Sequence, residues 1–193
     1  MDPEPIAVRL AVTRAMAREL NGYLRGGKLH FELRVDAPGG SLPVVMTLGA
    51  LLENLAALRR EQGALTPVQL EELQDALRDV ERDRRLLAGP WRSILRRELK
   101  ALVNAWRWYV DELEAQQPRA RENYAGEVRK RLRIALLLEE LGQSPDLTGD
   151  REKLAVDDAR LRQRFRDGDY VGPGGANQAY RPERAWWLYG SPV

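Results

Sequence analysis

The sequence predicts a mainly α-helical protein: an antiparallel bundle of five to six helices with a small β element near the N-terminus and an irregular C-terminal tail. Three observations lead to this prediction. Apolar residues recur at helical spacing from about residue 43 to residue 168, one short segment alternates apolar and polar residues, and the final 25 residues contain three prolines and four glycines. A chain of 193 residues is long enough to bury a substantial core.

The N-terminal segment, from about residue 4 to residue 23, favours a helix because its apolar residues lie four positions apart. These residues are Val8, Val12, Met16 and Leu20. Residues 6–13 also alternate strictly between apolar and other residues, so a strand stays open as the alternative for that part.

The clearest strand covers residues 28–36, where apolar and polar side chains alternate between two glycine-containing segments. A single strand leaves backbone donors and acceptors unpaired, so this one needs a partner. Three partners stay open: residues 6–13, the C-terminal tail, or the same strand of a second copy of the chain.

From about Pro43 onward the pattern is helical. The first of these helices ends at Gly63, and its apolar residues are Leu48, Leu51, Leu52, Leu55 and Leu58. The next helix begins at Thr66 and Pro67, a capping residue followed by proline at the first helical position, and continues to about Ala88.

Gly89 and Pro90 end that helix and begin another, whose apolar residues alternate between four- and three-residue spacing, as in a bundle seam. The seam consists of Leu95, Leu99, Leu102, Trp106, Tyr109 and Leu113. Pro118 opens a further helix that ends before Gly142, and Asp150 can cap a last helix that contains Phe165 and ends at Gly168. We therefore expect a helical domain over residues 1–168, including the strand 28–36, and a tail over residues 169–193 that packs on the same domain.

Composition excludes several classes of site. The chain has no cysteine, which excludes disulfides, thiolate nucleophiles and cysteine-ligated metals, and its single histidine excludes a multi-histidine metal site. His30 lies on the polar face of the predicted strand, and the acidic pairs lie on exposed helix faces. We therefore expect no catalytic residue, no metal and no cofactor. Because residues 1–5 resemble no secretory signal and no segment is apolar enough to span a bilayer, we expect a cytoplasmic protein without a membrane partner.

The chain is arginine-rich, with 27 arginines among its 31 cationic residues, and its basic residues concentrate between residues 82 and 133. That stretch has a net charge of +7, whereas residues 61–81 and 134–158 each have a net charge of −5. If two of its helices are neighbours, a polyanion such as nucleic acid could bind one basic surface. The candidate residues are Arg92, Arg96, Lys100, Arg129, Lys130, Arg131 and Arg133. The alternative is that these charges pair with the neighbouring acidic segments.

Aromatic residues gather in two places. Trp91, Trp106, Trp108 and Tyr109 fall on one predicted helix, where Trp108 lies off the apolar seam, and the tail contains a second group. Trp, Tyr and Arg are frequent anchors of protein interfaces. The candidate partner-binding residues are therefore Trp108, Tyr180, Trp186, Trp187 and Tyr189. The tail can instead fold back and close its own core.

Three functions remain, in decreasing order of preference. The first is a non-enzymatic helical protein-interaction or scaffold module that forms a specific complex through the tail and the unpaired strand, with a homodimer as one form of it. The second is a nucleic-acid-binding accessory protein that uses residues 82–133. The third is an enzyme or carrier that holds an anionic ligand in a pocket between helices.

Overall fold

The computed structural model describes residues 6–173 and 180–193, apart from the side chain of Pro118. The described part of the chain is mainly helical and contains seven α-helices and two small sheets. None of its helices combines the length and the apolar composition that crossing a bilayer requires.

The chain packs into two compact units, Met1–Glu98 and Leu99–Val193. The sequence predicts one helical domain over residues 1–168 with the tail 169–193 packed on it, and the division into two units falls within the long helix α4 (Ala88–Glu114). Because the helices divide between two units, the predicted single antiparallel bundle of five to six helices is not confirmed.

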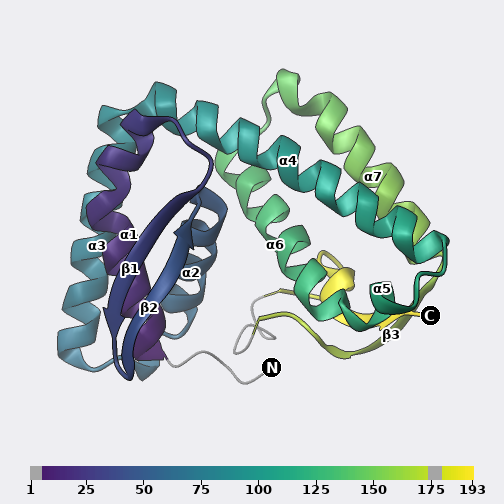
Figure 1. Ribbon diagram of the computed structural model, residues 1–193, viewed down its shortest axis with the longest axis horizontal. Coiled ribbons are helices and arrows are strands. Elements are labelled where there is room, and N and C mark those ends of the chain that lie inside the picture. The colour runs from purple at the N-terminus through teal and green to yellow at the C-terminus, as the bar shows by residue number, and fades with distance from the viewer. Residues whose placement is uncertain (1–5, 174–179) are drawn as a thin grey trace. The chain divides into compact units, whose positions relative to one another are not determined.

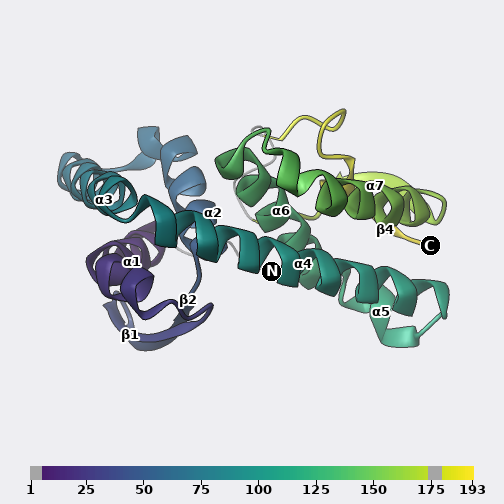
Figure 2. The ribbon, with the colours of Figure 1, turned by 90° about the horizontal axis from the view of Figure 1, so that it is seen from above.

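The first unit is built around three helices, a hairpin and the first part of α4. The helices are α1 (Ile6–Gly26), α2 (Leu48–Arg60) and α3 (Pro67–Leu86). The prediction of a helix at the N-terminus is confirmed over the described residues, and the alternative of a strand over residues 6–13 is wrong. In Figure 2, α1 lies between α3 and the hairpin. The fully buried side chains of Met16, Leu20, Leu51, Leu58 and Leu73 form part of this core.

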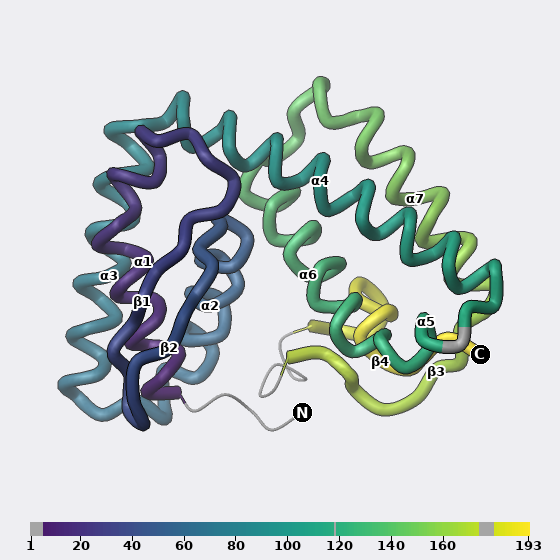
Figure 3. Tube along the Cα trace, in the orientation of Figure 1, coloured from purple at the N-terminus to yellow at the C-terminus, as the bar shows by residue number. Residues whose placement is uncertain are grey.

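The hairpin supplies the strand partner that the sequence left open. β1 (Phe31–Ala37) pairs antiparallel with β2 (Gly40–Met46), and Gly39 in the turn has a φ of +102°, a value that favours glycine. None of the three predicted partners is the observed one in this chain. Figure 3 follows β2 directly into α2, whose N-cap Thr47 accepts a hydrogen bond from the Ala50 N–H. The helix therefore begins at Leu48 rather than near Pro43.

The second unit contains the rest of α4 and three further helices. They are α5 (Pro118–Glu122), α6 (Tyr124–Leu141) and α7 (Thr148–Arg162). The single helix predicted from Pro118 to Gly142 is interrupted at Asn123. Most of the predicted seam is buried, although Leu102 is only half-buried.

The described parts of the C-terminal segment contain more regular structure than the sequence predicted. β3 (Phe165–Tyr170) pairs antiparallel with β4 (Tyr189–Pro192), and a short 3₁₀ helix, η3 (Trp186–Leu188), precedes β4. Phe165 and Gly168 were predicted to end a helix, but both lie in β3, because α7 ends at Arg162. The 180–193 segment belongs to the second unit, in which Figure 1 draws it in yellow.

Candidate interaction surface

The free edge of β1 is the first candidate surface, and Pro43 defines its geometry. Pro43 lies opposite Arg34 in the hairpin register. Proline has no N–H, so it fits a strand position whose N–H would point away from the partner strand. Antiparallel pairs alternate between those that exchange hydrogen bonds and those that do not. The backbone groups of Glu32, Arg34 and Asp36 therefore face away from β2.

We call the backbone N–H and C=O groups of Glu32, Arg34 and Asp36 the β1 edge. Within the described part of the chain, β1 has no strand neighbour besides β2, and no backbone hydrogen bond from another segment reaches these groups. All three side chains are exposed. Such a row of unpaired backbone donors and acceptors is a template for another strand.

The opposite edge of the hairpin differs because of its proline. By the same alternation, Ser41, Pro43 and Val45 turn their backbone groups outward from β2. Pro43 removes the central donor of that row, and a proline on an edge strand is a common obstacle to further pairing. The β1 edge is therefore the better template of the two.

Sequence reasoning identified β1 as an unpaired strand but missed β2. A signal was present, because Leu42, Val44 and Met46 alternate after the turn at Gly39. Pro43 and the apolar Val45 obscured this alternation and made the segment resemble the beginning of a helix.

The candidate aromatic residues of the tail are largely covered within the second unit. Trp187 is buried, while Tyr180, Trp186 and Tyr189 are half-buried. The Tyr124 hydroxyl donates a hydrogen bond to the Trp187 carbonyl, and the Trp186 ring contacts the ring of Phe165 edge-on. The tail thus contributes to its own core, and its role in binding a partner stays a prediction.

Trp108 is the candidate aromatic residue with the most exposed side chain. It lies on α4 within the second unit and is 71% exposed, whereas Trp106, two positions earlier, is fully buried. This difference follows from the seam, since residues two positions apart face different sides of a helix.

The candidate basic residues lie in different environments. Lys130 pairs with Glu127, and the buried guanidinium of Arg131 pairs with Asp158. Arg129 and Arg133 are half-buried and have interaction partners. The exposed candidates on α4 are Arg92 and Arg96, in the first unit, and Lys100, in the second.

Arg131 forms the centre of a buried polar cluster. Its Nε lies 3.0 Å from Asp158 Oδ1, and its Nη2 lies 2.7 Å from Asp158 Oδ2. The Trp106 indole N–H also donates to Asp158 Oδ1, at 3.0 Å. On its face, the Arg131 guanidinium lies 3.8 Å from the centre of the Trp187 ring. These contacts satisfy the guanidinium within the fold, and they join α4, α6, α7 and η3.

A second charge cluster joins α4 and α7. Arg160 donates hydrogen bonds to Glu114, Asp111 and Asp157. Hydrogen bonding to Arg160 lowers the pKa of the Glu114 carboxyl. Burial raises the pKa of the Asp157 carboxyl, whose Oδ2 has no hydrogen-bond partner among the described residues. The cluster holds α4 and α7 together.

No group of three or more histidine, aspartate or glutamate side chains in the described residues is arranged to hold a metal ion. His30 is exposed just before β1. No family model, no curated protein and no solved structure matches this chain.

Proposed function

We propose that this chain is a helical protein-interaction module and that its partner is a second copy of itself, bound through the β1 edge. The observation behind the proposal is that the exposed charges along this edge complement themselves when two copies of β1 run antiparallel. β-Augmentation of this kind gains affinity from main-chain hydrogen bonds and specificity from the side chains that alternate along the strand.

The complementarity depends on one register. With Leu33 of each copy on the two-fold axis, Glu32 of one copy faces Arg34 of the other, twice. The same register places Asp36 opposite His30. Opposite charges in directly facing positions stabilise a strand pair.

The neighbouring registers are unfavourable. With Arg34 on the axis, two arginines face each other and Glu32 faces Asp36. With Glu32 on the axis, two glutamates face each other. Like charges directly opposite each other destabilise a strand pair, so the charges select the register centred on Leu33.

An edge of this length buries little surface. Interfaces below roughly 1,200 Å² are typical of weak or transient complexes. We therefore expect a reversible dimer whose population rises with protein concentration rather than an obligate one.

Sedimentation velocity over a concentration series tests the proposal. The unmodified chain should shift from monomer to dimer as its concentration rises. Arg34→Glu should weaken the dimer about tenfold, because two attractive cross-strand pairs become repulsive. The double variant Glu32→Arg/Arg34→Glu should restore the dimer, since each introduced charge again faces its opposite.

The matched control is Arg92→Glu, which makes the same charge change at an exposed position of α4, in the first unit but outside the hairpin. It should leave the dimer unchanged. A chain that stays monomeric at every concentration would contradict the proposal. If the Arg34→Glu variant dimerises as well as the unmodified chain, the dimer does not form through the β1 edge. That result would favour Trp108 or the tail as the contact.

Nucleic-acid binding through residues 82–133 has less support. Lys130 and Arg131 are engaged with acidic side chains of their own unit. Fluorescence anisotropy with labelled DNA tests this alternative.

A further inference from the structure

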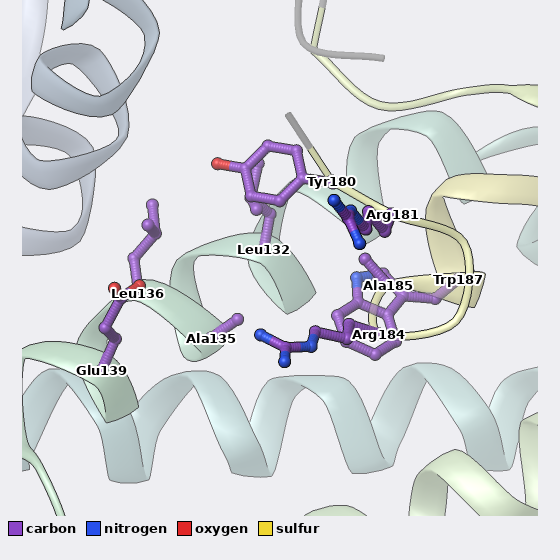
Figure 4. A pocket seen from close by; sticks show the side chains of 9 residues that line it. All are labelled: Leu132, Ala135, Leu136, Glu139, Tyr180, Arg181, Arg184, Ala185 and Trp187. Carbon is purple, nitrogen blue, oxygen red and sulfur yellow. The ribbon is translucent and has the colours of Figure 1, made fainter. Parts of the chain in front are cut away.

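We propose that a pocket in the second unit binds a small molecule that combines a flat apolar body with one anionic oxygen group. The pocket lies between α6 and the 180–187 segment, and its volume is about 660 Å³. Figure 4 shows the side chains that line it. Volumes of about 300–1,000 Å³ are typical of sites for small ligands. This proposal is independent of the dimer, since none of its residues belongs to the first unit.

The pocket has an apolar wall. Ala135 and Leu136 follow Leu132 by three and four positions, so α6 presents both beside Leu132 on one face. Ala185 and Trp187 line the pocket from the tail. A flat apolar group placed between these two sides would exclude water from both, which is the main source of affinity for such a ligand.

The tail also supplies two guanidinium groups. Arg181 and Arg184 line the pocket, and Figure 4 shows both side chains turned toward it. Arginine's planar fork can bind a carboxylate, sulfonate or phosphate through paired hydrogen bonds. Both residues are exposed, so their charges are accessible to a ligand that enters from solvent.

The orientation of the ligand follows from the remaining charge. Glu139 is the one acidic residue that lines the pocket, and it lies at the opposite end from the two arginines in Figure 4. Repulsion from this carboxylate directs the anionic group of a ligand toward Arg181 and Arg184.

Trp187 gives a second, independent indication of a ligand. Its indole Nε1 is buried and has no hydrogen-bond partner among the described residues. A buried donor without an acceptor costs free energy, and such groups are few in folded proteins. Because the Trp187 ring is held against Arg131, it cannot turn this donor outward without losing that contact. An oxygen of the ligand would supply the missing acceptor.

Fluorescence titration with anilinonaphthalene sulfonate tests the site, because this probe combines a flat aromatic body with one sulfonate. We expect saturable binding with a blue shift. The double variant Arg181→Glu/Arg184→Glu should weaken binding by tenfold or more, on the order of one lost charge-assisted hydrogen bond. Phenylnaphthylamine, the probe without its sulfonate, should bind both proteins with affinities within about threefold of each other.

Two controls separate this site from nonspecific attraction. Arg119→Glu/Arg121→Glu makes the same charge change at exposed positions of α5 and should leave binding unchanged. Ala135→Trp fills the apolar wall and should weaken binding of both probes, while near-ultraviolet circular dichroism verifies that the fold persists.

Competition by naphthoate and by naphthyl phosphate then shows which anionic group the arginines prefer.

The proposal fails if no saturable binding is seen. It also fails if the variants at Arg181 and Arg184 bind the anionic probe as well as the unmodified chain does, or if the α5 control loses as much affinity.

Discussion

Arg131 shows how much a single residue's role depends on segments far away in the chain. The sequence grouped it with Arg129, Lys130 and Arg133 as one basic surface, because all four lie within five residues. Its guanidinium is instead buried against Asp158 and Trp187, which follow 27 and 56 positions later. Local charge predicts that a residue is basic. It cannot predict which distant carboxylate or ring will cover that residue.

We expect Arg131→Leu to lower the free energy of unfolding by about 3 kcal/mol, because it leaves the largely buried Asp158 carboxylate without its cation. Urea unfolding, followed by tryptophan fluorescence, measures this loss. Arg131→Leu/Asp158→Asn should lose less than the single variant, since it removes the unpaired charge as well.

The control for this prediction is Arg121→Leu on α5, an exposed position where the change should stay within about 0.5 kcal/mol. Equal losses from Arg121→Leu and Arg131→Leu would show that the Asp158 contact contributes nothing specific.

Trp108 and Trp106 illustrate what sequence can predict about a single residue. Their exposure follows from the helical period alone, because the seam of α4 includes Trp106 and leaves Trp108 outside it. For the tail, no period exists. Whether Trp187 packs on its own unit or on a partner depends on the shape of α6 and of its neighbours, which the sequence does not reveal.

At the scale of elements, periodic segments were predicted well and short ones poorly. Most helices and β1 were recognised because each repeats its pattern over several turns or pleats. The helix α5, only 5 residues long, was merged with α6. β2 was missed because Pro43 breaks the pattern within seven residues. Phe165 was assigned to α7 because its spacing fits a helix, although it pairs with Pro192 in the second sheet. Strand pairing is a long-range choice that a local pattern does not specify.

The hairpin permits a prediction about Pro43. Replacing Pro43 with valine supplies the backbone N–H that the edge of β2 lacks, and it opens a second template on the hairpin. We expect Pro43→Val to form species larger than a dimer at high concentration. Light scattering coupled to size-exclusion chromatography measures their mass.

Ser41→Val is the control, because it adds an apolar β-branched side chain to the same edge and keeps the proline. We expect Ser41→Val to form no species with a mass greater than that of a dimer. If both variants give the same distribution of masses, hydrophobicity rather than the missing donor limits pairing along β2.

At the scale of the whole molecule, paired charges limit what the high arginine content can do. In both units, arginines bind acids of their own unit: Arg9 pairs with Glu61 in the first, and Arg160 pairs with Glu114 in the second. The sequence alone is compatible with both a basic surface and internal pairing of these charges. Only the fold shows which acids lie within reach.

This pairing leads to a prediction about nucleic acid. In fluorescence anisotropy with labelled random-sequence DNA, we expect weak binding at low salt, with a slope of log K against log salt no steeper than about −3. No binding should persist near physiological salt. The variant Arg92→Glu/Lys100→Glu should abolish the residual binding.

A steeper slope, or binding that survives physiological salt, would contradict this expectation. Such a result would favour residues 82–133 as a binding site for polyanions.

The fold class was predictable, but the division into two units was not. The periodicity of each helix indicates which of its faces is apolar, so the sequence predicts a mainly helical protein. Which faces meet depends on the loops and on side-chain shapes. The sequence therefore could not show that α4 contributes to two cores rather than to one bundle.

The order in which the two cores can close during translation follows from the C-terminal strand. A chain leaves the ribosome from its N-terminus, so the first unit can fold once residues up to 98 have emerged. The core of the second unit includes Trp187, Leu188 and β4, so it cannot be completed before they are synthesised. Until then, Tyr124 and Phe165 lack the contacts that cover them. A ribosome that stalls before residue 186 would therefore hold a nascent chain whose first unit can fold while apolar residues of the second unit stay exposed. Chaperones bind exposed apolar surface of this kind.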